Sequence, residues 1–283
     1  MFQNYYYCLV AGLPDLFLDD SELSFSMEEF KSSLKVELKP SDYKLVELVF
    51  LPYDNENLLH VLREEFDALS PLGNFSYEEF ETELGEDKRN ILPEYMYRFI
   101  DSYRNDEGKK KPWEKHELTL TKMYYAYALQ TKNSFLHQWF SFNRDIKNLL
   151  AGFNCRKFEI EPETQMVGDN FITEAIIKSG SRDFGLETEL DYLTELMSAI
   201  EKESLLQREK DIDKMKWDKL EKITLFEYFS VDVVLAYVIK LDLVYRWMKL
   251  DEETGRKMFK QLINDLKSSL EFPKEYSING KNK

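Results

Sequence analysis

The chain has 283 residues, and its 53 acidic and 38 basic side chains give a formal net charge of −15. A chain this acidic repels the phosphates of nucleic acids and the anionic lipids of a membrane surface, which disfavours both as direct partners. Hydrophobic residues make up 43% of the chain, close to the globular average. With only 10 glycines and 8 prolines but 14% aromatic residues, the composition predicts an all-α protein whose long helices pack through large rings.

The two cysteines, Cys8 and Cys155, form no disulfide framework and no CxxC pair. Residues 1–13 have apolar character but lack the basic start of a signal peptide. No run of eighteen apolar residues occurs, so we expect no segment that inserts into a membrane. These features predict a reduced, cytoplasmic protein.

The first third of the chain contains two similar helix starts. Residues 25–30 and 75–80 both read Phe-Ser-x-Glu-Glu-Phe. This pattern predicts serine N-caps at Ser26 and Ser76, each with a glutamate three residues later that reaches back and a pair of phenylalanines that pack across the cap. The duplication reflects either an internal repeat or the frequency of such caps in short helices.

The helix starting at residue 26 is followed by an apolar pattern over residues 41–66. It predicts two helices, or one helix that is kinked at Pro52 because proline removes a backbone donor. A further helix is expected near residues 92–103. The very polar stretch at residues 105–112 is typical of an exposed connection.

In the second half, residues 113–151 contain neither glycine nor proline, and apolar residues recur every three or four positions. The pattern predicts one helix of about forty residues or two helices with a short break. We interpret residues 155–160 as a short strand or an extended link, and Gly168, Gly180 and Gly185 as turns. A second long helical stretch with breaks covers residues 186–250. A final helix over 251–270 and a loose tail over 273–283 complete the prediction.

Motifs for catalysis or metal binding are absent from the sequence. There is no GxxxxGK[ST] loop and no GxSxG motif. His116 and Glu117 begin a zinc-protease pattern, but Leu120 stands where the second histidine would be. A di-iron bundle needs Glu-x-x-His, and the residues three before the histidines are Asn57, Trp113 and Ser134. We therefore expect no catalytic, cofactor or metal site, unless an active site is assembled from scattered residues.

A polar pattern does recur. Residues 54–59 and 145–150 share Asp-x-x-Asn-Leu-Leu, and a weaker copy begins at Asp242 after a nearly equal interval. The positions that we single out are Asp54, Asn57, Asp145, Asn148, Asp242 and Tyr245. Asp and Asn three residues apart lie on one helical face, where they can fix the register between helices or contact a partner protein. The spacing predicts a single helical domain with three internal units, approximately 1–75, 76–165 and 166–283.

These copies, together with residues 226–229 leading into 231–237 and Lys240, resemble the C-type central-stalk subunit of the V/A-type rotary ATPases, whose eukaryotic counterpart is the d-type subunit. The segment at Asn148 matches the motif of that family best, and residues 235–248 match its C-terminal helix. Met166 to Gly168 stand where such subunits carry a glycine turn.

Residues 5–18 also resemble a V-ATPase-associated family of uncharacterised bacterial proteins. There are departures from the rotary ATPase pattern: Tyr245 replaces asparagine in the third copy, and the basic residue expected soon after Asn148 comes only at Arg156.

The resemblance implies an elongated, funnel-like bundle of three pseudo-repeated units without catalytic activity or cofactor. Such a protein belongs to the central stalk, links the rotor shaft to the membrane proteolipid ring, and transmits torque for ion transport. It is cytoplasmic and peripheral to the membrane through its complex. Two alternatives remain open from the residues: a helical adaptor or scaffold without a rotary role, and an enzyme with a dispersed site.

Overall fold

The computed structural model of the chain describes residues 5–20, 23–85, 90–105 and 112–249. As predicted, the fold is all-α: within these ranges the regular elements are helices, and there is no strand. One isolated antiparallel bridge joins Tyr5 to Ser230. The predicted final helix over 251–270, the tail over 273–283 and residues 106–111 of the polar connection lie outside the described ranges.

The first half of the chain forms α1 (Tyr7–Ala11), α2 (Met27–Glu37), α3 (Pro40–Leu62), the 3-10 turn η1 (Phe66–Ala68), α4 (Tyr77–Leu84), α5 (Glu94–Arg104) and α7 (Trp113–Ala128). Both predicted capping boxes are present, at Ser26 and Ser76. Of the two alternatives for residues 41–66, one helix is observed, and α3 runs through Pro52.

The second half forms α8 (Ser134–Phe158), the 3-10 turn η2 (Pro162–Thr164), α9 (Phe171–Lys178), α10 (Leu193–Ile200), α11 (Leu205–Thr224) and α12 (Val231–Lys249). The long apolar pattern is therefore two helices, α7 and α8. The break ends at Asn133, whose side chain caps α8 by accepting a hydrogen bond from the backbone of Leu136 at 2.8 Å. Gly168 and Gly185 lie in turns with φ of +74° and +72°.

The expected strand or extended link at residues 155–160 is wrong, because α8 continues to Phe158. Leu149, Gly152 and Cys155 are all buried. Residues three apart lie on the same face of a helix, whereas in a strand they would point to opposite faces. The helix ends at Glu159, which adopts the left-handed conformation with φ of 55°.

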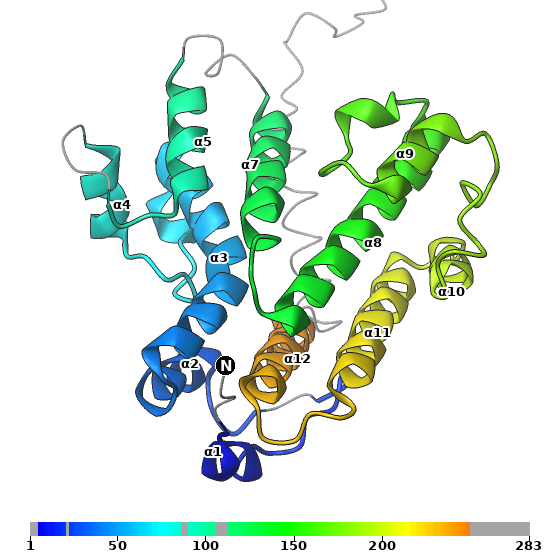
Figure 1. The fold of residues 1–283 in the computed structure, drawn as a ribbon. Coiled ribbons are helices and arrows are strands. Elements are labelled where there is room, and N and C mark those ends of the chain that lie inside the picture. The colour runs from blue at the N-terminus through cyan, green and yellow to red at the C-terminus, as the bar shows by residue number, and fades with distance from the viewer. Residues whose placement is uncertain (1–4, 21–22, 86–89, 106–111, 250–283) are drawn as a thin grey trace, which may run out of the picture.

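Two groups of helices diverge from a common base (Figure 1). The first group contains α3, α4, α5 and α7, with α7 packed on both α3 and α5. The second contains α8 to α11, with α8 packed on α9 and α11. At the base, α12 contacts α2, α3 and α11 and so joins the two groups. No helix among the described residues combines the length and the apolar character needed to cross a bilayer.

Candidate functional site

The first Asp-x-x-Asn segment lies on the buried side of α3 and binds the loop that follows the helix. Asn57 exchanges two hydrogen bonds with the backbone of Ser70: its amide nitrogen donates to the carbonyl oxygen at 2.9 Å, and its oxygen accepts from the N–H at 2.7 Å. Asp54 accepts from the backbone of Asn74 at 2.5 Å and of Phe75 at 3.1 Å, and from the amide of Asn74 at 2.6 Å. We call this arrangement the first clasp.

Lys31 of α2 closes the first clasp from the opposite side. Its ammonium group donates to the carbonyl oxygens of Leu72 at 2.7 Å and Gly73 at 2.8 Å. Gly73 is required by close approach, since a Cβ at this position would lie 2.6 Å from the amide nitrogen of Asn57 and 2.8 Å from a carboxylate oxygen of Asp54. The loop is thus held by side chains from two helices.

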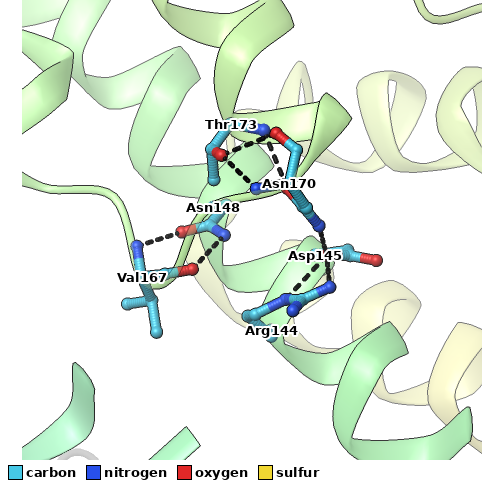
Figure 2. Close-up of polar contacts among 6 residues, drawn as sticks. All are labelled: Arg144, Asp145, Asn148, Val167, Asn170 and Thr173. Atoms are coloured by element: carbon cyan, nitrogen blue, oxygen red, sulfur yellow. Dashed lines mark hydrogen bonds and ion pairs between the residues drawn. The ribbon is translucent and has the colours of Figure 1, made fainter. Parts of the chain in front are cut away.

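The second Asp-x-x-Asn segment repeats this geometry on α8 (Figure 2). Asn148 exchanges two hydrogen bonds with the backbone of Val167, donating at 3.0 Å and accepting at 2.8 Å. Asp145 accepts from the amide of Asn170 at 2.9 Å, and Arg144 pairs with the same carboxylate at 3.0 Å. We call these contacts the second clasp.

The two clasps belong to equivalent stretches of chain. Each stretch contains a long helix, a 3-10 turn, the clasped loop and a helix of 8 residues that begins with a capping box. Asn170 is itself the N-cap of α9, whereas Asn74 lies two residues before the N-cap Ser76. The repeat therefore pairs α3 with α8 and α4 with α9. The predicted unit boundaries near residues 75 and 165 both fall in the clasped loops.

The third copy lies on α12 and makes a different contact. Asp242 accepts a hydrogen bond from the hydroxyl of Tyr53, the residue before Asp54, and so links α12 to α3. Tyr245 stands where the other copies have asparagine, and the ammonium group of Lys249 lies 4.3 Å from its ring centre. The chain that follows α12 is outside the described residues.

Of the six positions that the sequence singled out, four bind loops and two lie on α12. Asp54 and Asn148 are fully buried, and Asn57 is 3% exposed, so these side chains act inside the protein. The hypothesis that the pairs fix helix register is therefore refined: in the two clasps they fix a loop on a helix. The clasps leave these three side chains no surface on which a partner protein could bind.

Burial controls the electrostatics of the clasps. It raises the pKa of Asp54 from 3.8 to about 7, although the donors at Phe75 and Asn74 oppose this shift. Burial likewise raises the pKa of Asp145, against the nearby Arg144, and lowers the pKa of Lys31 to about 8. Polar groups in such surroundings are costly unless they are bonded, and the clasps supply the bonds.

Apart from the two clasps, a buried polar cluster joins α11 to α12. No motif in the sequence predicted it. Asp213 is fully buried and accepts from the indole N–H of Trp247 at 3.0 Å and from the ammonium group of Lys216 at 3.0 Å. Arg246 donates to the same carboxylate. Because one carboxylate ties together two residues of α12 and one of α11, it fixes the packing of these helices.

The enzyme alternative would need a cavity with reactive side chains. A groove of about 420 Å³ between α3 and α7 is lined by Glu56, His60, Arg63 and Glu117, among others. Two of its lining residues are bonded to carboxylates, since Arg63 donates to Glu117 at 3.0 Å and His60 bonds to Glu65 at 2.8 Å. The side chain of Glu117 is 52% exposed, so the groove is open to solvent. In the described ranges, no three or more His, Cys, Asp or Glu side chains are placed to hold a metal ion.

Several residues of the clasps and of the contact with α12 were not predicted. Asn170 had a recognisable signal, because it precedes an apolar run as an N-cap does. Asn74 had a weaker one, as it lies next to Gly73 in a turn-like sequence. Lys31 and Tyr53 had none, since only the packing of α2 and α12 brings them to these sites.

The fold and the clasps define a class of protein: an all-helical one in which buried Asp and Asn side chains fix loops on long helices. The chain belongs to the family described as "Protein of unknown function (DUF2764)", whose model matches residues 3–270. No curated protein and no solved structure matches the chain.

Proposed function

We propose that this protein is a non-catalytic central-stalk component of a V-type ATPase or ATP synthase. In this role it links the rotor shaft to the membrane proteolipid ring and transmits torque for proton or other ion transport. The observation that carries the proposal is the recurrence of the Asp/Asn clasp on α3 and α8. The same segments underlie the resemblance to the C-type central-stalk subunit of the rotary ATPases.

A torque-transmitting part must deform little under stress, and two features of the fold support this. The clasps tie loops to helices through reciprocal bonds, which limits their movement. Large rings also bridge successive helices, for example Tyr124 of α7 with Phe140 of α8 at 6.1 Å between ring centres. Dense packing of this kind gives a protein interior low compressibility.

The direct test is purification of the chain, tagged at its chromosomal gene, from its native cells under conditions that keep membrane complexes intact. The proposal expects the ATPase catalytic, shaft and proteolipid subunits in constant ratio to the tagged chain. Deletion of the gene should abolish ATP-driven ion transport in membrane vesicles, and the wild-type gene should restore it.

A helical adaptor without a rotary role is the alternative, and the same purification separates the two. An adaptor would bring down other proteins and leave ATP-driven ion transport intact after deletion. That result would contradict the rotary proposal.

A further inference from the structure

Two distant segments of the chain meet at the base of the molecule. The backbone N–H of Tyr6 donates to the carbonyl oxygen of Phe229 at 2.7 Å, beside the bridge between Tyr5 and Ser230. The rings of Tyr7 and Phe229 lie 4.7 Å apart. Figure 1 shows the result, with α1 and the connection between α11 and α12 together at the lower end.

This junction exposes large apolar side chains. Phe226 is 83% exposed and Tyr228 is 69% exposed. Leu225, Tyr5 and Tyr7 are exposed as well. We call these five side chains the base patch. Single exposed apolar residues need no explanation, but neighbouring ones that include aromatic rings are typical of surfaces that bind a partner.

The two segments that build the junction carry charge of one sign. The two segments that build the junction, residues 5–20 and 225–232, contain five acidic residues and no lysine or arginine. Asp15 and Asp20 act on α12 at this end, since both raise the pKa of Tyr237 after the larger effect of burial. Two connections that carry a lysine adjoin the junction: the backbone N–H of Lys39 donates to the hydroxyl of Tyr6 at 3.3 Å, and Asn133, next to Lys132, donates to Asp232 at 2.7 Å. The acidic character therefore belongs to the two segments themselves.

We propose that the base patch is a docking surface for a protein partner that presents apolar side chains flanked by lysine or arginine. The exposed rings supply the apolar contact at the centre, and the acidic side chains supply complementary charge at the rim. The same acidic side chains repel an anionic lipid surface, which favours a protein over a membrane as the occupant. The assignment concerns the surface and the chemistry of its partner, and it holds for an adaptor as well as for a rotor component.

The partner is identified first. A photo-crosslinking phenylalanine analogue is introduced at Phe226 of the full chain in its native cells, and at Phe171 as a control. Phe171 is 57% exposed and belongs to α9, away from the base. We expect one protein to crosslink at position 226 and not at 171, through a peptide that carries apolar residues next to lysine or arginine. An acidic crosslinked peptide, or equal crosslinking at both positions, would overturn the proposal.

The affinity for that identified partner is then measured with purified proteins. The double variant Phe226→Ser/Tyr228→Ser should weaken binding at least tenfold, whereas the matched control Phe158→Ser/Phe171→Ser should not. Charge reversal by Asp15→Lys/Asp19→Lys should weaken binding several-fold, and Glu161→Lys/Glu163→Lys should have no such effect. Since all eight side chains lie at the surface, unchanged circular dichroism is expected for every variant.

Vesicle flotation tests the membrane as occupant. Binding of the wild-type chain to vesicles of phosphatidylcholine and phosphatidylglycerol that is lost in Phe226→Ser/Tyr228→Ser would overturn the proposal. Unchanged affinity of that variant for the crosslinked partner would overturn it too. A partner that is no part of an ATPase, yet meets the affinity criteria, would instead contradict the rotary proposal and support the base patch.

Discussion

Asn57 and Asn148 each make the same pair of hydrogen bonds with one backbone residue, Ser70 and Val167 respectively. An asparagine side chain carries a donor and an acceptor in one plane. It can therefore bond both the N–H and the C=O of a single loop residue, as a neighbouring strand would in a sheet. The loop backbone is thereby satisfied in the protein interior, where an unbonded N–H or C=O would be costly. This is a structural role that alanine cannot fill.

We predict that Asn148→Ala lowers the free energy of unfolding by about 1–3 kcal/mol, because it leaves the backbone N–H and C=O of Val167 unbonded. Asp145→Ala should cost a similar amount, about 1–3 kcal/mol, since it removes the acceptor of Asn170. Chemical denaturation measures both. The matched control is Asn154→Ala on the same helix, where the side chain is exposed. Equal stability of the Asn148 variant and the control would rule out this role.

The raised pKa of Asp54 predicts a pH dependence with a defined sign. Its pKa rises from 3.8 to about 7 in the folded protein, so the folded state holds the proton more tightly than the unfolded state. Asp54 therefore contributes stability that is fully present below pH 3.8 and is lost as the pH rises through about 7.

The test compares the free energy of unfolding of the wild type and Asp54→Asn between about pH 3 and about pH 7.5, the range that spans both pKa values. We expect the difference, wild type minus variant, to fall as the pH rises. Lys31 titrates mainly above this range, because its pKa is lowered to about 8 in the folded state, and the charge of Asp54 is one of the effects that oppose this lowering. A difference that is constant with pH would contradict the assignment.

At the scale of elements, each clasp fixes the start of the next helix. The loop residues that bind α3 and α8 are followed at once by the capping boxes of α4 and α9. A capping box sets the residue at which a helix begins. The clasp sets the position of that residue in space, so the two together determine the path of the chain. The interior of a long helix thus positions a short helix that follows later in the sequence.

Gly73→Ala tests the fit of the first loop on α3. The added methyl group would meet Asn57 at 2.6 Å and Asp54 at 2.8 Å, so the clasp must open or shift. We expect a loss of stability of about 1–3 kcal/mol. Gly180→Ala is the control, because a Cβ there meets nothing within 4 Å. Thermal melting of both variants gives the answer, and a Gly73 variant as stable as the control would show that the loop is not held tightly.

Asp213 tests the contact between α11 and α12. Asp213→Ala removes the acceptor shared by Arg246 and Trp247, although Arg246 keeps its bond to Glu209. We expect a loss of about 1–3 kcal/mol, as for the loss of hydrogen bonds to a buried charged group. Asp218→Ala breaks only the exposed pair with Lys214 and should cost no more than about 1 kcal/mol. Similar losses for both variants in urea denaturation would contradict the importance of the buried cluster.

At the scale of the whole molecule, α12 unites the two groups of helices, together with the direct contact between α7 and α8. It contacts α2 and α3 on one side and α11 on the other, and Asp242 and Arg246 reach across these contacts. Force applied to one group therefore passes to the other through packed helices rather than through flexible connections. This arrangement suits a connector, whatever partners it joins.

The net charge of −15 predicts how assembly depends on salt. Association with basic partner surfaces is favoured by long-range attraction, and salt screens it over about 10 Å at 0.1 M. The amount of partner recovered with the tagged chain should therefore fall markedly as salt is raised from about 0.05 to 0.5 M. A recovery that is independent of salt would show that the charge of the chain contributes nothing to assembly.

The sequence determined the helical class, most helix positions and the two capping boxes, because these features depend on residues within one or two turns of each other. The recurring Asp and Asn side chains were found in the same way. The end of α8 was misjudged, since residues 155–160 carry too short a pattern to separate strand from helix.

Tertiary structure alone decided what the polar side chains bind. Asn57 meets Ser70 and Asp54 meets Asn74 only because the chain turns back over α3, and Lys31 reaches the same loop from α2. The exposure of the rings at the base could not be predicted either, because a phenylalanine has the same sequence pattern whether it is buried or exposed. Burial and long-range pairing arise from the packing of the whole chain, so the local periodicity of the sequence does not predict them.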